Sequence, residues 1–112
     1  MCTRTQLDSI TDCIKRCYRE IYGDSVVEII LYGSYARGDY EADSDIDIVA
    51  IVKGERRELQ EKLKKIWDIS ADIGLENDAV ISPMVIPYDE YMSYRRILPY
   101  YRNIAEEGRR IG

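Results

Sequence analysis

Two apolar, β-branched segments joined by a polar connection constrain the fold of this chain most strongly. Residues 26–32, VVEIILY, are nearly all apolar, and residues 45–52, DIDIVAIV, alternate acidic and aliphatic side chains before becoming wholly apolar. Both patterns are typical of β-strands with a buried face. The connection between them, GSYARGDYEADS, is polar and has room for a short helical turn. The sequence therefore predicts two strands of a central sheet.

Helical patterns precede and follow these strands. Apolar residues at helical spacing predict a helix over residues 5–22, ended by a Gly-Asp pair. A segment rich in Glu, Lys and Leu predicts an amphipathic helix over residues 55–73, ending near Gly74. Residues 79–86, AVISPMVI, predict a third strand, in which Pro83 indicates an edge position or a bulge.

The C-terminal part of the chain is predicted to be helical in parts from Tyr88 onward, with an interruption at Pro99. The resulting order of elements is helix, strand, strand, helix, strand, helix. This order predicts an α+β (α/β) fold with a small mixed β-sheet and packed helices. A length of 112 residues, without a repeat or a linker, indicates a single domain over residues 1–112.

The composition excludes several classes of function. The chain has no histidine, which rules out Ser-His-Asp and Cys-His catalysis, so any chemistry must rest on carboxylates and hence on a bound metal. A net charge of −5 disfavours binding to long nucleic acids but allows a small anionic substrate if a metal offsets the charge. No apolar run approaches the roughly 20 residues that span a bilayer, and the N-terminus lacks the apolar region of a secretory signal. We therefore expect a cytoplasmic protein without a membrane segment.

One constellation carries chemical information: a GS pair, ten intervening residues and a DID tripeptide. Side chains alternate along a strand, so Asp45 and Asp47 are expected on one face, about 7 Å apart. Ile46 and Ile48 then enter the core. Two converging carboxylates can hold one or two magnesium ions, which prefer oxygen ligands and keep positions open for phosphate. The sequence therefore predicts Asp45 and Asp47 as catalytic residues and metal ligands.

The GS pair supplies the second half of the predicted site. Gly33 follows a predicted strand and allows a close backbone approach, and Ser34 offers a hydroxyl and backbone N–H groups to a phosphate oxygen. Phosphoryl chemistry needs mainly positioning and charge neutralisation, which this arrangement supplies without histidine.

These residues allow three other interpretations. An EF-hand loop starting at Asp43 would have Ile48 where glycine is required. A P-loop starting at Gly33 would have Asp39 where lysine is required. The third alternative is a charged strand end beside an ordinary turn, which would require several independent features to coincide.

At these residues the chain resembles the minimal members of the DNA polymerase beta superfamily of nucleotidyltransferases, whose signature is GS, a spacer, and DxD. The signature here is GSYARGDYEADSDID, and the resemblance extends over residues 5–90. It implies that Gly33 and Ser34 bind a triphosphate and that Asp45 and Asp47 ligate magnesium. It also implies a nucleotide-binding role for Arg37, the alternative being an exposed arginine in a turn.

The same resemblance implies a function. The chain would transfer a nucleotidyl group, AMP from ATP before other nucleotides, with Mg²⁺ to a hydroxyl of a partner protein or a small molecule. Minimal members are often antitoxins paired with a small helical HEPN-type toxin, and some transfer AMP to a tyrosine of that partner. The alternative is a non-catalytic, nucleotide-binding antitoxin or interaction module that neutralises a partner by binding alone.

One departure from the family pattern bears on turnover. The family usually has a third carboxylate on the later strand, whereas residues 79–86 contain no acid. Ser82 or Met84 occupies the expected place. Asp78 is a nearby acidic substitute, but an acid beside Asn77 at a turn is more typical of a cap. Binding of nucleotide and magnesium is therefore better supported than catalysis.

The ten tyrosines of the chain suggest two further roles. Tyr35 and Tyr40 flank the GS pair and are candidates to stack on a base. Five others predict a partly exposed aromatic surface near the C-terminus: Tyr88, Tyr91, Tyr94, Tyr100 and Tyr101. The alternative is that these five pack the last helix on the sheet. If both hold, a partner protein or a second copy of the chain covers this face.

Overall fold

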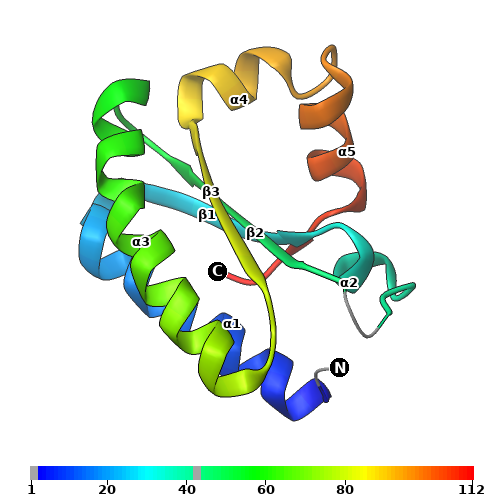
Figure 1. Ribbon diagram of the computed structural model, residues 1–112. Coiled ribbons are helices and arrows are strands. Elements are labelled where there is room, and N and C mark those ends of the chain that lie inside the picture. Colours follow the sequence, from blue (N-terminus) through cyan, green and yellow to red (C-terminus); the bar gives the residue numbers. More distant parts are fainter. Residues whose placement is uncertain (1–2, 42–43) are drawn as a thin grey trace.

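The computed structural model describes residues 3–41 and 44–112, so Ala42 and Asp43 of the predicted connection lie outside the described residues. The elements are α1 (Arg4–Tyr22), the 3₁₀ turn η1 (Gly23–Ser25), β1 (Val26–Tyr32), α2 (Ser34–Arg37), β2 (Ile46–Val52), α3 (Arg56–Asn77), β3 (Ile81–Pro87), α4 (Tyr88–Tyr94), α5 (Pro99–Glu107) and β4 (Arg109–Arg110) (Figure 1).

The strands form one mixed sheet in the order β3-β2-β1-β4. β1 is antiparallel to both β2 and β4, whereas β2 and β3 are parallel. The predicted α+β (α/β) fold with a small mixed sheet is therefore confirmed. Pro83 lies in β3, at the edge of the sheet, where its missing N–H is tolerated because one side of the strand has no neighbour.

The two longest helices are amphipathic and start differently. α1 begins with a capping box, in which the Thr3 side chain accepts a hydrogen bond from the Gln6 N–H and the Gln6 side chain accepts one from the Thr3 N–H. α3 begins at Arg56 without a side-chain cap. Within the described ranges, no helix combines the length and the apolar character needed to cross a membrane.

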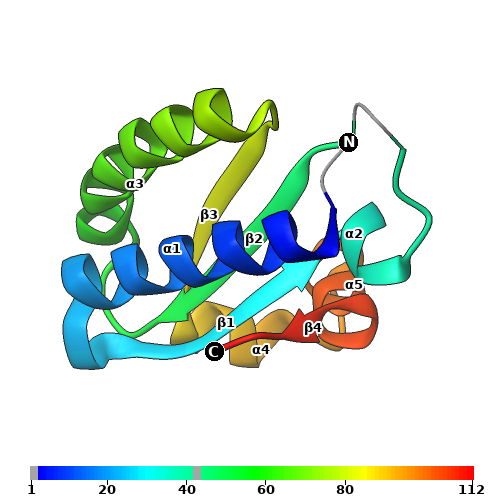
Figure 2. The same cartoon turned by 90° about the horizontal axis from the view of Figure 1, so that it is seen from below.

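Helices α1 and α3 cover one face of the sheet, as Figures 1 and 2 show from two directions. Their apolar sides pack on alternating residues of β1, β2 and β3 to form the larger hydrophobic core. As predicted, Ile46 and Ile48 are buried in it. The Tyr18 hydroxyl of α1 accepts a hydrogen bond from the Met84 N–H at 3.1 Å and donates to the Met84 carbonyl at 2.7 Å. This buried hydroxyl ties α1 to the backbone of β3.

Helices α4 and α5 cover the other face over a smaller core (Figure 2). Its buried members among the described residues are Ile30, Val49, Ile51, Ile86, Tyr91 and Ile104. Glu90 of α4 accepts a hydrogen bond from the Tyr101 hydroxyl of α5 at 2.8 Å and forms an ion pair with Arg56. These contacts connect α4 to α5 and to the start of α3.

The tyrosines of this second face divide into two groups. Tyr91 is buried and Tyr88 and Tyr101 are half-buried, whereas Tyr94 and Tyr100 are exposed. Both interpretations of the aromatic residues therefore apply: some pack α4 and α5 on the sheet, and others remain on the surface.

Two features differ from the sequence predictions. α3 continues past Gly74 to Asn77, and Asp78 ends it in a left-handed conformation with φ 52° and ψ 49°. A Cβ on Gly74 would lie 2.5 Å from the Ala79 carbonyl oxygen, so this glycine allows the chain to turn back closely and does not end the helix. The sequence does not predict β4, because two consecutive arginines show no apolar alternation, and backbone pairing with β1 alone defines this strand.

Candidate active site

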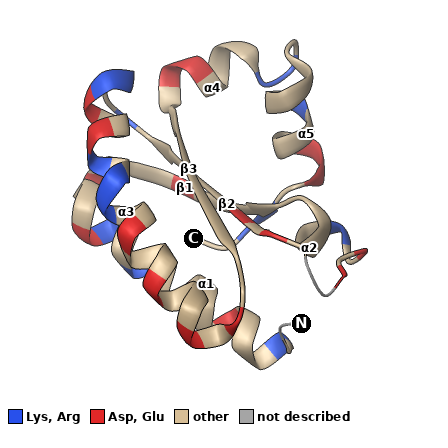
Figure 3. Ribbon diagram, in the orientation of Figure 1, with Lys and Arg blue, Asp and Glu red and all other residues tan. Residues whose placement is uncertain are grey.

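The turn at Gly33 brings the end of β1 against the start of β2. Tyr32, the last residue of β1, is paired with Asp47 across the antiparallel ladder. A Cβ on Gly33 would lie 2.5 Å from Asp47 Oδ2, and Gly33 has a φ of 74°. Glycine is required here because it tolerates positive φ and leaves room for the carboxylate. The GS pair and the DxD segment therefore meet, and Figure 3 shows the acidic start of β2 beside α2.

Asp45 and Asp47 form a pair of mutually repelling carboxylates. Asp47 is half-buried in β2, and Asp45 is exposed just before the strand, which begins at Ile46 and not at Asp45 as predicted. Burial raises the pKa of the Asp47 carboxyl, and the negative charge of Asp45 raises this pKa further. The two acids therefore lie close enough to interact electrostatically.

Arg37 is the cation that faces these acids. It ends α2, and its side chain forms ion pairs with Asp39 at 3.3 Å and with Glu107 of α5 at 3.6 Å. Its charge also lowers the pKa of Asp47, which partly offsets the effects of burial and of Asp45. Arg37 is exposed, as a turn arginine would be; it forms its ion pairs with Asp39 and Glu107, and it acts on Asp47 through its charge.

Ser34 and the flanking tyrosines have different surroundings. The Ser34 hydroxyl, next to Gly33, makes no hydrogen bond with any residue that the structure describes, so it is available to a ligand. Tyr35 and Tyr40 stack on each other, with ring centroids 4.3 Å apart. Tyr35 is buried in the core beneath α1 and α3. The stacked rings therefore anchor the GS pair to the core.

β3 adds no acid to the pair. Ser82 lies opposite Asp47 in the β2–β3 register, and Met84 lies two residues further along, opposite Val49, so Ser82 is level with Asp47. Asp78 caps the C-terminal end of α3, which is the cap that its position beside a turn predicts. Among residues 3–41 and 44–112, no three acidic or cysteine side chains lie close enough to hold a metal ion together.

The chemistry of the two acids fits magnesium. Mg²⁺ is commonly bound by one or two carboxylates, with substrate phosphates and waters completing its shell. The repulsion between Asp45 and Asp47 would fall when a cation lies between them, because each negative charge then gains an opposite neighbour. With two protein carboxylates, such an ion would depend on the triphosphate for several of its ligands.

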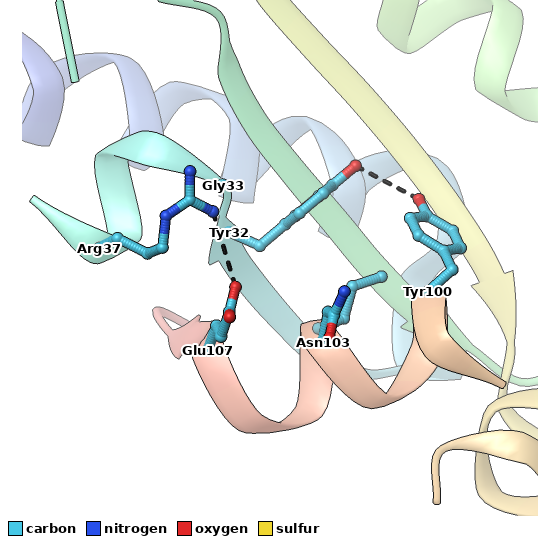
Figure 4. Close-up of a pocket in the computed structure, with 7 residues that line it drawn as sticks. Tyr32, Gly33, Arg37, Tyr100, Asn103 and Glu107 are labelled. Carbon is cyan, nitrogen blue, oxygen red and sulfur yellow. Dashed lines mark hydrogen bonds and ion pairs between the residues drawn. The ribbon is translucent and has the colours of Figure 1, made fainter. Parts of the chain in front are cut away.

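A cavity of about 220 Å³ opens beside Gly33. Its polar lining comes from the β1–α2 corner and from one side of α5: Tyr32, Gly33, Arg37, Tyr100, Asn103 and Glu107 (Figure 4). The hydroxyls of Tyr32 and Tyr100 are 3.3 Å apart. The sequence predicts Tyr100 only as part of an aromatic surface and does not indicate Asn103 or Glu107, because the α5 residues form no known motif and only their spacing along one helical face was a signal.

Comparison with known proteins identifies the family of this chain. The turn at Gly33 and the nearby acids are the residues on which the resemblance to nucleotidyltransferases rests. The model of the family described as "Nucleotidyltransferase domain" matches residues 12–111. The chain therefore belongs to the nucleotidyltransferase domain family, and the predicted enzyme class is confirmed.

Two proteins of Methanocaldococcus jannaschii are similar to this chain in sequence. The candidate protein adenylyltransferase MJ0141 is 42% identical over 71 residues, which cover 63% of this chain and 70% of MJ0141. The candidate protein adenylyltransferase MJ0604 is 32% identical over 88 residues, which cover 79% of this chain and 80% of MJ0604.

Solved structures show the same fold. A toxin–antitoxin MntA–HpeT mutant matches with a TM-score of 0.53 and 16% identity, over 91% of this chain and 71% of that chain. A candidate minimal nucleotidyltransferase matches with a TM-score of 0.54 and 15% identity, over 92% of this chain and 93% of that chain. Together with the family match and the sequence relatives, this shared fold confirms the predicted resemblance to minimal nucleotidyltransferases.

Proposed function

We propose that this chain transfers AMP from ATP, with Mg²⁺, to a hydroxyl group of a partner protein or small molecule. The observation that carries the proposal is the contact between Gly33 and Asp47, which places a candidate phosphate-binding turn directly against a candidate metal ligand. The names of the M. jannaschii relatives, protein adenylyltransferases, support AMP as the transferred group.

Each residue of the site has a role in this proposal. Gly33 and Ser34 hold the triphosphate, and Arg37 exchanges a carboxylate partner for a phosphate oxygen. Asp45 and Asp47 hold magnesium, which would supply the positive charge that offsets the triphosphate when bound. The acceptor oxygen forms a bond to the α-phosphorus, the bond to the β-phosphate oxygen breaks, and pyrophosphate leaves. The hydroxyl proton passes to water, because no third carboxylate stands at the acid pair within the described residues.

Thermal unfolding with and without ligand tests the site. A ligand that binds only the folded state at 100 times its Kd adds about 2.7 kcal/mol to the free energy of unfolding. We therefore expect Mg²⁺ with ATP to raise the Tm of the wild type and not that of an Asp45→Ala, Asp47→Ala double variant. The matched control changes two exposed acids of α3, Asp68→Ala with Asp72→Ala, and should keep the full rise. A rise that survives in the Asp45, Asp47 variant would exclude these residues as the metal site.

A second function, neutralisation of a partner by binding alone, is favoured by one observation. Residues 79–86 contain no acid, and Ser82, one of the two residues at the expected place of the family's third acid, lies opposite Asp47, which favours binding over turnover. Toxin–antitoxin complexes among the structural neighbours support a toxin as the partner, and the family resemblance implies a toxin of the HEPN type. ATP labelled at the α-phosphate separates the two functions. A partner protein that becomes labelled must have received AMP from this chain. A partner that co-elutes with this chain but stays unlabelled is only bound.

A further inference from the structure

The cavity beside Gly33 is continuous with the proposed triphosphate site. Gly33 and Arg37 line both, so a molecule whose phosphates lie at the GS pair would have its remaining part next to α5. Figure 4 shows Tyr32 reaching from β1 toward Tyr100, with Asn103 beside them on α5. The inference drawn from this arrangement rests on the proposed function.

The walls of the cavity suit a flat, uncharged group. Ligand pockets for whole small molecules usually measure about 300–1,000 Å³, so a cavity of about 220 Å³ holds only part of a nucleotide. The Tyr32 and Tyr100 rings meet edge to face, with centroids 6.4 Å apart, and Ile104 adds an apolar surface. The charge of Arg37 is balanced by Glu107 at 3.6 Å. The cavity therefore offers aromatic surface and little net charge, as a nucleobase requires.

Asn103 gives the cavity a hydrogen-bonding group of defined pattern. Its amide makes no hydrogen bond with the described part of the chain, so its donor and its acceptor are both available. An amide that donates and accepts side by side matches the N6–H and N7 edge of adenine, whereas guanine presents two acceptors at that edge. We infer that this cavity binds the adenine base of the nucleotide, with Asn103 as the residue that distinguishes adenine from guanine.

The inference assigns a specificity role to α5, which contributes nothing to the proposed metal site. Tyr100, Asn103 and Glu107 lie on one side of this helix, three and four residues apart. In this inference the exposed ring of Tyr100, held in place by its contact with Tyr32, stacks on the base, Asn103 hydrogen-bonds to the base edge, and Glu107 keeps Arg37 next to the phosphates. In this inference, residues of α5 select the nucleobase, whereas residues of the β1–α2 corner bind the triphosphate.

Calorimetric titration of three ligands with Mg²⁺ tests this assignment: ATP, GTP and inorganic tripolyphosphate. The wild type should bind ATP about 10-fold more tightly than either of the others, because one well-formed amide–base contact discriminates by roughly that factor or more. Asn103→Ala should remove the preference for ATP over GTP and leave tripolyphosphate affinity unchanged. Tyr100→Ala should weaken ATP and GTP alike, whereas Tyr100→Phe, which keeps the ring, should weaken neither by more than about 2-fold.

The matched control is Glu106→Ala, an exposed change on α5 outside the cavity, which should alter none of the three affinities. Equal affinity of the wild type for ATP and tripolyphosphate would overturn the base assignment and leave the proposed triphosphate site intact. Equal loss of all three ligands in Asn103→Ala would also overturn it, because that pattern belongs to a residue with a structural role. Failure of every ligand to bind the wild type would reject the proposed function itself, and the base assignment with it.

Discussion

The two faces of the sheet differ in how completely helices close them. Beneath α1 and α3, the core extends over three strands and takes in fully buried side chains such as Ile14, Tyr18 and Ile66. Beneath α4 and α5, the buried set is smaller, and the helices leave apolar residues such as Ile97 and Leu98 exposed. Asp47 belongs to this second face, because it alternates with Ile46 and Ile48, which enter the first core.

This difference separates stability from function. The closed face fixes the strands and, through the stacked Tyr35 and Tyr40, fixes the GS turn at their end. The open face carries the acids and the cavity, where a ligand can reach them. Binding residues generally lie on less stable parts of a molecule that a rigid scaffold positions. The following predictions test whether the faces are as distinct as their packing indicates.

The largest expected effect is loss of a buried side chain from the closed face. Ile14 and Ile104 are 0% and 1% exposed, so their truncation to alanine removes equally buried atoms from opposite faces. Ile14→Ala should lower the free energy of unfolding by about 2–5 kcal/mol. Ile104→Ala should cost about 2 kcal/mol or less, because α5 has fewer buried neighbours and can shift into the space. Urea denaturation measures both, and equal costs would show that the two faces are equally rigid.

The next effect concerns ligand binding on the open face. Asp47→Asn should lower the affinity for Mg²⁺ in the presence of ATP by about 100-fold or more, since loss of an outer-shell partner alone costs about 10–100-fold. Isothermal titration provides the measurement, and Asp72→Asn on α3 is the matched control.

The same variant should be more stable than the wild type at neutral pH without ligand. The pKa of Asp47 is raised, so the folded state binds its proton more tightly than the unfolded state does. The free energy of unfolding therefore falls as pH rises from the ordinary pKa of an aspartate to the raised pKa of Asp47 in the folded state. It remains at this lower value at neutral pH. Asparagine carries no charge to bury at neutral pH, so Asp47→Asn should raise the Tm by a few degrees. A lower Tm in Asp47→Asn would mean that the carboxylate is stabilised by its surroundings.

The closed face and the acid pair could be predicted from the sequence because their signals are local. The strand at residues 45–52 alternates acids with Ile46 and Ile48, and the structure buries both isoleucines while Asp47 faces the other way. The pairing of Tyr32 with Asp47 is a property of the ladder between β1 and β2. The sequence indicated two strands and a turn, and the antiparallel register adds the contact at Gly33.

The open face could not be predicted to the same degree because it depends on long-range contacts. Glu107 meets Arg37 only after α5 packs on the sheet, and Tyr100 meets Tyr32 for the same reason. The three elements from α4 to β4 have no motif, and β4 consists of two arginines held by backbone pairing. Tyrosines near the GS pair were natural candidates for base stacking, but packing turned Tyr35 into the core.

An intermediate effect is expected where the Tyr18 hydroxyl connects α1 to β3. Tyr18→Phe would leave the Met84 N–H without the acceptor that the Tyr18 hydroxyl provides at 3.1 Å. A buried backbone group that loses its partner costs about 1–3 kcal/mol. The matched control is Tyr94→Phe, where the hydroxyl is on an exposed ring and its removal should change the free energy of unfolding by less than about 0.5 kcal/mol. Similar values for the two variants in urea denaturation would mean that the closed face does not depend on this hydroxyl.

The smallest effect is a gain in stability at Ser70, a buried polar residue of the closed face. The Ser70 hydroxyl of α3 is buried and has no hydrogen-bond partner among the described residues. Ser70→Ala removes a polar group that lost its water on folding, and it also improves helix propensity, so the free energy of unfolding should rise by about 1 kcal/mol. Ser9→Ala, at an exposed position of α1, changes helix propensity alone and should gain about 0.5 kcal/mol or less. The difference between the two variants, measured by thermal unfolding, isolates the buried hydroxyl. If Ser70→Ala instead destabilises the protein, this hydroxyl has a partner such as a bound water, and the closed face contains a polar site that its packing does not reveal.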